Sequence, residues 1–306
     1  VDQTTKNINK RCIQVLLYHR VCDVDSDPQQ LCVNPNNFLL QMEYLKENFP
    51  IIKLSDLDNI ISSGEVPIKS IVVTFDDGYL DNLQYAKPIL EGLDIPATFF
   101  ITSGYIGKDM EFYQETLNRV FLQKENLPLE LTVNIEGKVF HYKNLEKSSN
   151  RKTAYEELHL VLRSKKESIR KTIIKELIDW SKLGSLPNKN HMNLNEDELR
   201  NLARGDLFDI GAHSINHLPL SILTKDEQQE EIFNSKLALQ KILKDDVNVF
   251  AYPYGTKDDY NHVSINLVSK NNYILACSNY PGIVSSSTYR YEIPRLVVQD
   301  WDIKKF

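Results

Sequence analysis

The stretch Thr74-Phe75-Asp76-Asp77-Gly78 combines two features on which the interpretation of the whole chain depends. It follows the short apolar run Ile71-Val72-Val73, which is typical of a buried strand in a parallel sheet. At the end of such a strand the chain turns, so two neighbouring carboxylates can reach one pocket. Carboxylates that close repel each other and favour unlike roles, such as base and metal ligand. By itself the pentapeptide also fits a simple turn.

Length and composition describe an ordinary globular protein. The 306 residues suffice for one large α/β domain or two smaller ones. The net charge of −6 at pH 7 and the lack of a Lys/Arg run argue against nucleic acid as a partner. No apolar stretch approaches the roughly 20 residues of a membrane span, so we expect no transmembrane segment. The oligomeric state is left open.

The four cysteines bear on the compartment. None has the CxxC spacing of a zinc–thiolate site; they are Cys12, Cys22, Cys32 and Cys277. Cys22 and Cys32 flank one loop and could pair in an oxidising compartment, whereas four free thiols fit the cytoplasm. We therefore favour a cytoplasmic location, with the cell envelope or secretion as the alternative if a signal peptide preceded Val1.

Strand-like and helix-like segments alternate along much of the chain, which predicts a parallel sheet or barrel. Besides the strand before Asp76, we predict strands at 13–18, 51–54, 97–101, 208–212, 247–252, 273–277 and 293–298. Predicted helices begin after Asn34, Ser55, Asn195 and Thr224, and a further helix covers about 79–90.

The region from Asp109 to about Asn193 departs from this alternation. It is charged, with helical patterns at 113–126, 151–164 and 167–180, and a hairpin-like alternation at 129–142. We interpret it as an insertion into an α/β domain that spans 11–306, and we expect it to lie near the rim of the site and shape substrate access. Its three histidines lack metal-ligand spacing, so we expect none of them to bind a metal: His141, His159 and His191.

Two further motifs lie at predicted strand ends. His213-Ser214-Ile215-Asn216-His217 places two histidines four residues apart, on one face if the segment is helical. That spacing suits two imidazoles on one divalent cation, and it also fits two surface histidines on a helix. Together with one aspartate the pair makes a three-ligand site with open positions for water and substrate, as in catalytic metal sites. Pro253-Tyr254-Gly255 by itself indicates only a turn.

Taken in order, the motifs at 74–78, 213–217 and 252–255 resemble the NodB-type polysaccharide deacetylases, carbohydrate esterase family 4. The stretches Leu17-Tyr18-His19-Arg20-Val21 and Pro294-Arg295 resemble a branch of that family found with envelope and exopolysaccharide genes. The resemblance covers most of the chain outside the insertion. It implies a distorted (β/α)7 TIM-like barrel with its site at the C-terminal ends of the strands. It also implies an acetylated carbohydrate as substrate and a divalent metal ion, usually Zn2+.

The resemblance assigns roles to individual residues. Asp77, His213 and His217 would bind the metal. Asp76 would be the general base that deprotonates the attacking water. The backbone N–H of Tyr254 would help to hold the tetrahedral oxyanion.

Two departures from the family pattern concern the remaining roles. Ala251-Tyr252 stands where the family commonly has an arginine that holds the base, and Arg295 on a late strand could reach Asp76 instead. The family commonly has a histidine on the last strand that acts as the general acid, but no histidine follows His262. We expect His19 to be this acid, because the first and last strands of a closed barrel are neighbours. The alternative is that His19 only forms a hydrogen bond within its loop.

These assignments predict a metal-dependent glycan N-deacetylase. The missing last-strand histidine keeps a sugar O-acetyl esterase or a small-molecule amidase open, because the leaving group of an ester needs less help. A third alternative is a carbohydrate-binding protein on an inactive barrel, against which the intact aspartates and histidines argue.

Overall fold

A computed structural model describes residues 11–184 and 191–306. The chain divides into two compact units. Among the described residues, the barrel unit comprises 11–23, Gln30–Ile106 and Leu194–Phe306, and the insert unit comprises Val24–Gln29, 107–184 and 191–193. Each unit has a hydrophobic core of its own.

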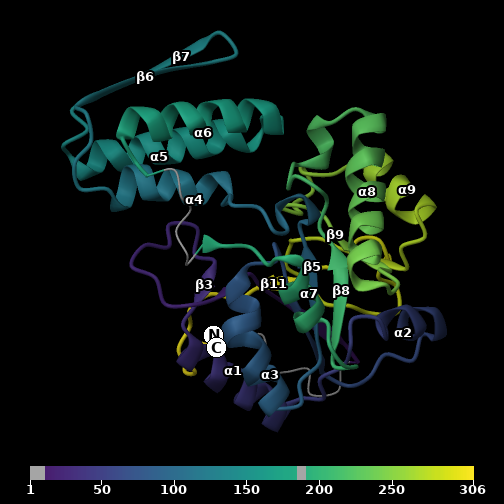
Figure 1. The fold of residues 1–306 in the computed structure, drawn as a ribbon. Helices are drawn as coiled ribbons and strands as arrows, with labels where there is room; N and C mark the ends of the chain where they lie inside the picture. The colour runs from purple at the N-terminus through teal and green to yellow at the C-terminus, as the bar shows by residue number, and fades with distance from the viewer. Residues whose placement is uncertain (1–10, 185–190) are drawn as a thin grey trace. The chain divides into compact units, whose positions relative to one another are not determined.

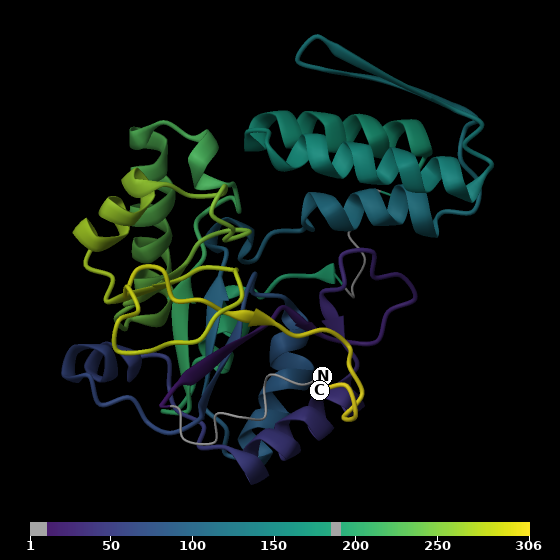
Figure 2. The ribbon, with the colours of Figure 1, turned by 180° about the vertical axis from the view of Figure 1, so that it is seen from behind.

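Seven parallel strands form the main sheet of the barrel unit, in the order β10-β9-β8-β5-β4-β1-β11 (Figure 1). Their bounds are β1 (Ile13–Tyr18), β4 (Ser70–Phe75), β5 (Ala97–Ile101), β8 (Phe208–Ala212), β9 (Val249–Ala251), β10 (Leu275–Cys277) and β11 (Leu296–Val297). The C-terminal strand β11 lies beside β1 (Figure 2). A parallel bridge from Cys277 to Ile293 brings β10 towards the segment before β11. The sheet is therefore curled into the distorted (β/α)7 barrel that the sequence predicted.

Helices alternate with these strands. They are α1 (Pro35–Asn48), α2 (Leu57–Ser63), α3 (Lys87–Gly92), α7 (Glu196–Leu202), α8 (Lys225–Leu243) and α9 (His262–Lys270), with the short turns η1 (Asn82–Ala86), η2 (Ser103–Tyr105) and η5 (Leu220–Ile222). The side chain of Asn34 caps α1, and Thr224 with Glu227 forms the capping box of α8, as predicted. A separate parallel pair joins β2 (Arg20–Val21) to β3 (Cys32–Val33).

Alternate residues of each strand face different cores. Leu16 and Tyr18 of β1 belong to the core shared with the helices. Val15 of β1 belongs to a smaller core with Val72 of β4 and residues of β9 and β10, which fills the inside of the curled sheet. Because strand side chains alternate, the inward face of β4 runs from Val72 through Thr74 to Asp76. The same alternation that directs apolar side chains of β4 to the inside of the barrel thus also directs the side chain of Asp76 towards the barrel mouth.

Several predicted elements differ in the structure. Residues 51–54 form no strand, and Ile51 makes only a single bridge with Ile71. The helix predicted over 79–90 is present from 80 to 92, but it contains the π-helical segment η1 before α3, next to Pro88, which has no N–H to donate to the preceding turn. The last three strands are shorter than predicted, since pairing at the curled edges of the sheet covers only two or three residues.

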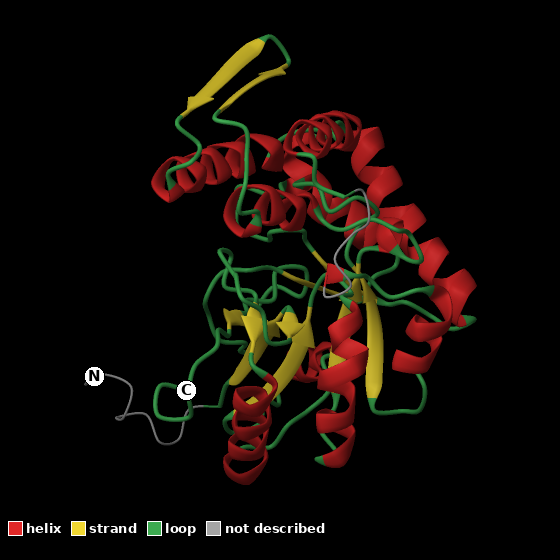
Figure 3. Ribbon diagram, turned by 60° about the vertical axis from the view of Figure 1, so that its left-hand side comes forward, coloured by secondary structure: helices red, strands yellow, loops and turns green. Residues whose placement is uncertain are grey.

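The insert unit is built from helices and one hairpin (Figure 3). Its elements are α4 (Tyr113–Asn118), η3 (Arg119–Gln123), β6 (Glu130–Ile135), β7 (Lys138–Lys143), α5 (Ser148–Arg163) and α6 (Glu167–Ser181). The helix predicted to reach residue 126 instead ends in the π-turn η3. At the hairpin turn Glu136 and Gly137 have φ values of 51° and 87°, the left-handed pair that a tight two-residue turn requires.

Two further expectations concern the described residues. No helix in the described part of the chain is long and apolar enough to cross a membrane. All four cysteines are free, so Cys22 and Cys32 form no disulfide here.

Candidate active site

The turn after β4 brings both aspartates to the mouth of the barrel. Asp76 continues the inward face of the strand, and Asp77 and Gly78 then adopt left-handed φ values of 77° and 86°. The conformation is strained for Asp77, and neighbouring backbone holds it: the Thr102 N–H donates to the carbonyl of Asp77 at 3.2 Å. A Cβ at position 78 would lie 3.1 Å from the side chain of Ile101, so glycine also fits the limited space.

His213 and His217 lie in a loop after β8, so the helical conformation that the sequence analysis considered for this pair is not adopted. Ser214 and His217 have left-handed φ values of 61° and 51°, which rule out a regular helix between the two rings. The ring centroids of the histidines are nevertheless 5.0 Å apart. Their convergence is therefore a property of the loop conformation and not of helical spacing.

Three side-chain atoms converge at this place. Oδ1 of Asp77 lies 3.2 Å from Nε2 of His217 and 3.5 Å from Nε2 of His213. Ligands on a tetrahedral zinc, with bonds of 2.0–2.1 Å, are about 3.3 Å apart. Asp77 Oδ1 is buried and has no hydrogen-bond partner of good geometry, as expected of an atom that faces a shared point. The donor set thus fits a divalent cation, and it is the one such group within residues 11–184 and 191–306.

A backbone carbonyl orients the first imidazole. Nδ1 of His213 lies 2.8 Å from the carbonyl oxygen of Ala251, which can only accept a hydrogen bond. In the neutral ring the proton therefore sits on Nδ1, and the lone pair of Nε2 points to the site. Burial lowers the pKa of His213, but the carboxylates of Asp76 and Asp77 more than offset burial and leave that pKa raised.

Arg295 holds the first aspartate through two parallel hydrogen bonds. Its Nη1 donates to Oδ1 of Asp76 and its Nη2 to Oδ2, both at 2.7 Å, and both side chains are buried. Nε of Arg295 donates to the carbonyl of Ser278 at 2.8 Å, which fixes the guanidinium. Burial raises the pKa of Asp76, but Arg295 and then His213 outweigh burial, and the pKa lies below its usual value. Asp76 is therefore ionised at neutral pH.

His19 and Tyr254 complete the set of residues predicted from the sequence. His19 lies at the end of β1, partly exposed, and its imidazole makes no hydrogen bond with the described residues. Burial lowers its pKa, against the opposing effect of Asp77 and Asp76. The ring of Tyr254, in the turn after β9, lies 4.6 Å from the ring of His217. Six of the seven predicted residues thus follow the C-terminal ends of β1, β4, β8 and β9, whereas Arg295 directly precedes β11 and reaches Asp76 with its side chain.

The model of the polysaccharide deacetylase family matches residues 63–159 and 183–275, which together exceed half of the chain. The chain belongs to the polysaccharide deacetylase family. Members of this family are hydrolases that act on carbon–nitrogen bonds of carbohydrates. The matched residues include the aspartates and both histidines, whereas His19 and Arg295 lie outside them.

Known relatives of this deacetylase are distant in sequence. It is 22% identical over 288 residues to YxkH of Bacillus subtilis (strain 168), whose name assigns it to the same family; the alignment covers 94% of this chain and 71% of YxkH. The Streptococcus pyogenes deacetylase PplD in complex with acetate is similar in fold, with a TM-score of 0.60 and 20% sequence identity. The alignment covers 94% of this chain and 93% of PplD. IcaB from Ammonifex degensii gives a TM-score of 0.61 and 16% sequence identity, and the alignment covers 95% of this chain and 93% of IcaB.

The deacetylase has one residue at this site that sequence reasoning missed. Glu231 of α8 is buried and binds the loop between the two histidines. The sequence held a signal for it, because Glu231 lies on the buried stripe of α8 next to Ile232 and one turn before Ser235. A carboxylate on the buried face of a helix has to find hydrogen-bond donors.

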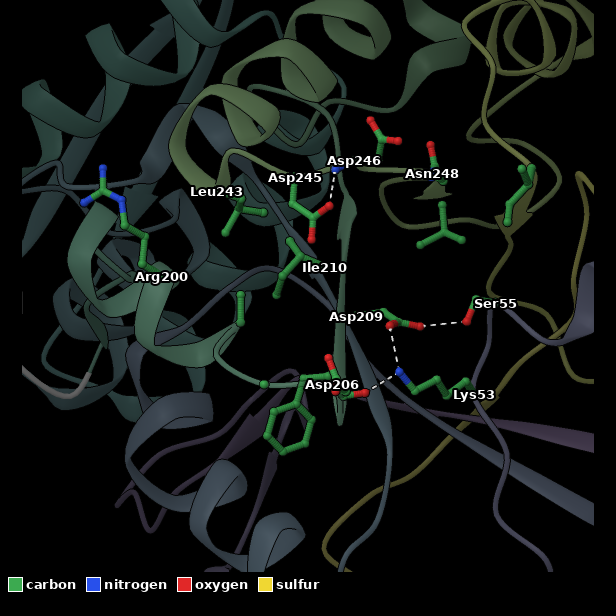
Figure 4. A pocket seen from close by; sticks show the side chains of 15 residues that line it. Lys53, Ser55, Arg200, Asp206, Asp209, Ile210, Leu243, Asp245, Asp246 and Asn248 are labelled. Carbon is green, nitrogen blue, oxygen red and sulfur yellow. Dashed lines mark hydrogen bonds and ion pairs between the residues drawn. The ribbon is translucent and has the colours of Figure 1, made fainter.

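A cavity of about 370 Å³ lies at the other end of the same strands (Figure 4). It is lined by Phe208 and Asp209 where β8 begins and by Asn248 and Val249 where β9 begins. In a parallel barrel the reacting groups gather at the C-terminal ends of the strands. The converging Asp77, His213 and His217 are therefore the candidate active site of the deacetylase, and this cavity is not.

Proposed function

We propose that this deacetylase removes N-acetyl groups from a carbohydrate with the help of a divalent metal ion, Zn2+ first among the candidates. Asp77, His213 and His217 would hold the ion. The observation that carries the proposal is the convergence of their three ligand atoms, with one buried carboxylate oxygen left without a hydrogen bond. A bound divalent cation would polarise the acetyl carbonyl and lower the pKa of the attacking water.

Asp76 is the proposed general base. Its two hydrogen bonds to Arg295 use two of the roughly four lone-pair sites of a carboxylate, so it can still accept a proton. The lowered pKa keeps Asp76 ionised and ready to accept, at the expense of basicity. Arg295 would also fix the direction of the carboxylate, which a base needs as much as the right pKa.

Tyr254 and His19 are proposed for the two remaining tasks. The backbone N–H of Tyr254 would stabilise the oxyanion that forms on the acetyl carbonyl. His19 would protonate the leaving amine, and the absence of a hydrogen bond from its ring to the described residues favours this role over that of a loop tether. The lowered pKa of His19 makes its protonated form a stronger acid and a less abundant one at pH 7.

A sugar O-acetyl esterase is the second candidate, on one specific observation. No histidine follows His262, so the last strand offers no acid of the usual kind, and an ester needs less help with its leaving group. The acetate in the structure of PplD is the common product of both reactions and supports deacetylation without separating them. That the insert unit shapes substrate access remains a prediction.

Release of acetate and of free amine from a panel of acetylated glycans would test the proposal. An N-deacetylase yields one amine for each acetate, whereas an O-acetyl esterase yields acetate alone. Metal content measured on the same preparation, before and after treatment with a chelator, tests the metal. Full activity in chelator-treated protein free of metal would overturn the proposed role of Asp77, His213 and His217.

A further inference from the structure

The loop that carries both histidines is strained. Ser214 and His217 are non-glycine residues with left-handed φ values of 61° and 51°. Such conformations are strained and persist only where neighbouring groups hold them. The Oγ of Ser214 accepts a hydrogen bond from the N–H of His217 at 3.0 Å, which is one such restraint.

Glu231 supplies a second restraint from outside the loop. Its Oε2 accepts hydrogen bonds from the backbone N–H groups of Ile215, at 2.8 Å, and of Asn216, at 2.9 Å. Its Oε1 accepts a third, from the side-chain amide of Asn216, at 2.6 Å. Only 6% of Glu231 is exposed, so these charge-assisted bonds are little screened by water.

The opposite side of the loop rests on backbone after β5. The N–H of Ser103 donates to the carbonyl of Ser214 at 3.1 Å, and that of Gly104 to the carbonyl of Ile215 at 2.9 Å. A Cβ at position 104 would lie 2.3 Å from that carbonyl oxygen, so the approach is too close for any other residue. These contacts hold the carbonyl groups of the loop, whereas Glu231 holds its N–H groups at Ile215 and Asn216.

We propose that Glu231 is a positioning residue for the metal site: it fixes the loop in the conformation that directs Nε2 of His213 and of His217 towards Oδ1 of Asp77. This inference rests on the proposed function, because it takes these atoms as the ligands of a divalent cation. Glu231 does not contact the ligand atoms and acts only through the backbone between the two histidines.

A carboxylate suits this position better than any other side chain. It offers about four acceptor sites, and three donors are present. Alanine would leave the half-buried N–H groups of Ile215 and Asn216 without this acceptor, and the loop would lose its restraint from α8. Glutamine would keep one acceptor oxygen and place an NH2 group against a donor. Loss of groups that orient metal ligands typically weakens metal binding roughly 10- to 100-fold.

Titration of the metal-free full chain with Co2+ tests this inference without measuring activity. Cobalt absorbs visible light when imidazole and carboxylate groups bind it, so the titration gives both the Kd and the geometry of the site. We expect Glu231→Ala to raise the Kd for Co2+ roughly 10- to 100-fold and to change the spectrum, with a smaller rise for Glu231→Gln. Glu230→Ala is the matched control, because Glu230 is the exposed neighbour on the same helix.

The outcomes separate this inference from the proposed function. If the unaltered protein binds no Co2+, the proposed metal site is wrong. If it binds Co2+ and folded Glu231→Ala binds it within about twofold, with an unchanged spectrum, the positioning role is wrong even if that variant is less stable. If Glu231→Ala does not fold, Glu231→Gln against Glu230→Gln decides: a Kd raised more than about threefold supports the role, and equal values overturn it.

Discussion

The two ends of the barrel both carry charged side chains, yet they differ in kind. At the N-terminal end, Lys53 pairs with Asp209 at 3.4 Å, and about a third of each side chain is exposed. At the C-terminal end, Arg295 pairs with Asp76 at 2.7 Å, and at most 4% of each side chain is exposed. Water screens the first pair, so its net contribution to stability is small. The contribution of the buried second pair depends on the geometry of its hydrogen bonds.

This difference shows why a hollow with charges is weak evidence of a site. Around the cavity in Figure 4, Lys53 bonds both Asp209 and the carbonyl of Asp206, and Ser55 donates to Asp209 at 2.9 Å. These charges already have partners on the surface. At the C-terminal end a buried oxygen of Asp77 faces two imidazoles without a good hydrogen bond, which is a feature that a ligand would satisfy.

The largest expected effect separates the two neighbouring aspartates. Asp77→Ala, His213→Ala and His217→Ala should each reduce acetate release by more than about 1,000-fold and lower the metal content, because three ligands leave little redundancy. Asp76→Asn should reduce activity as far but keep the metal, because a base is not a ligand. Metal analysis beside an acetate assay measures both. Equal metal loss in Asp76→Asn and Asp77→Asn would show that the roles are wrongly divided.

The next effect contrasts the two ion pairs. Arg295→Met leaves a buried carboxylate unpaired, so we expect the free energy of unfolding to fall by about 3–5 kcal/mol. Lys53→Met at the other end should cost about 1 kcal/mol or less. Urea unfolding of the metal-free variants measures both values. Addition of Asp76→Asn to Arg295→Met should restore part of the loss, and similar costs for the two single variants would contradict the contrast.

The third effect tests the acid. His19→Ala should reduce the rate on an N-acetyl substrate by about 100-fold or more, and far less on an activated acetyl ester, whose leaving group needs no proton. The protonated form is the active one, so the rate should fall as the pH rises through the pKa of His19. This fall at high pH should disappear from the pH–rate profile of His19→Ala, while the metal content stays unchanged. His262→Ala, at an exposed histidine, is the control. Equal losses of rate on the amide and the ester would show that His19 is not the acid and that it orients groups of the site instead.

The smallest effect concerns the cavity itself. Asp209→Asn should leave acetate release within about twofold and change the free energy of unfolding by about 1 kcal/mol or less, because the pair that it breaks is partly exposed. The same assays serve as for the other end. A large loss of activity in Asp209→Asn would mean that the two ends of the barrel are coupled.

Local features of the sequence were enough to predict most residues of the candidate site. Apolar runs located β1, β5 and β8, and the motifs that follow strands supplied Asp76, Asp77, His213 and Tyr254. The sequence pointed to the histidine pair but left open whether the segment between them is helical, and the structure shows a loop. Spacing of four residues is compatible with a helix, but the strained loop is held by Glu231 and Gly104, which are distant in sequence.

By itself the sequence determined which strands are buried, which turns end in reactive side chains and to which family the chain belongs. Hydrophobic periodicity and turn chemistry act over a few residues, so they can be recognised locally. The family resemblance suggested that Arg295 could reach Asp76, 219 positions away, and the tertiary structure confirmed this contact. Only the tertiary structure showed that Glu231 supports the loop between the histidines. Such contacts form when the sheet curls and brings distant segments together, and a buried charge is tolerated only where that closure supplies its partner.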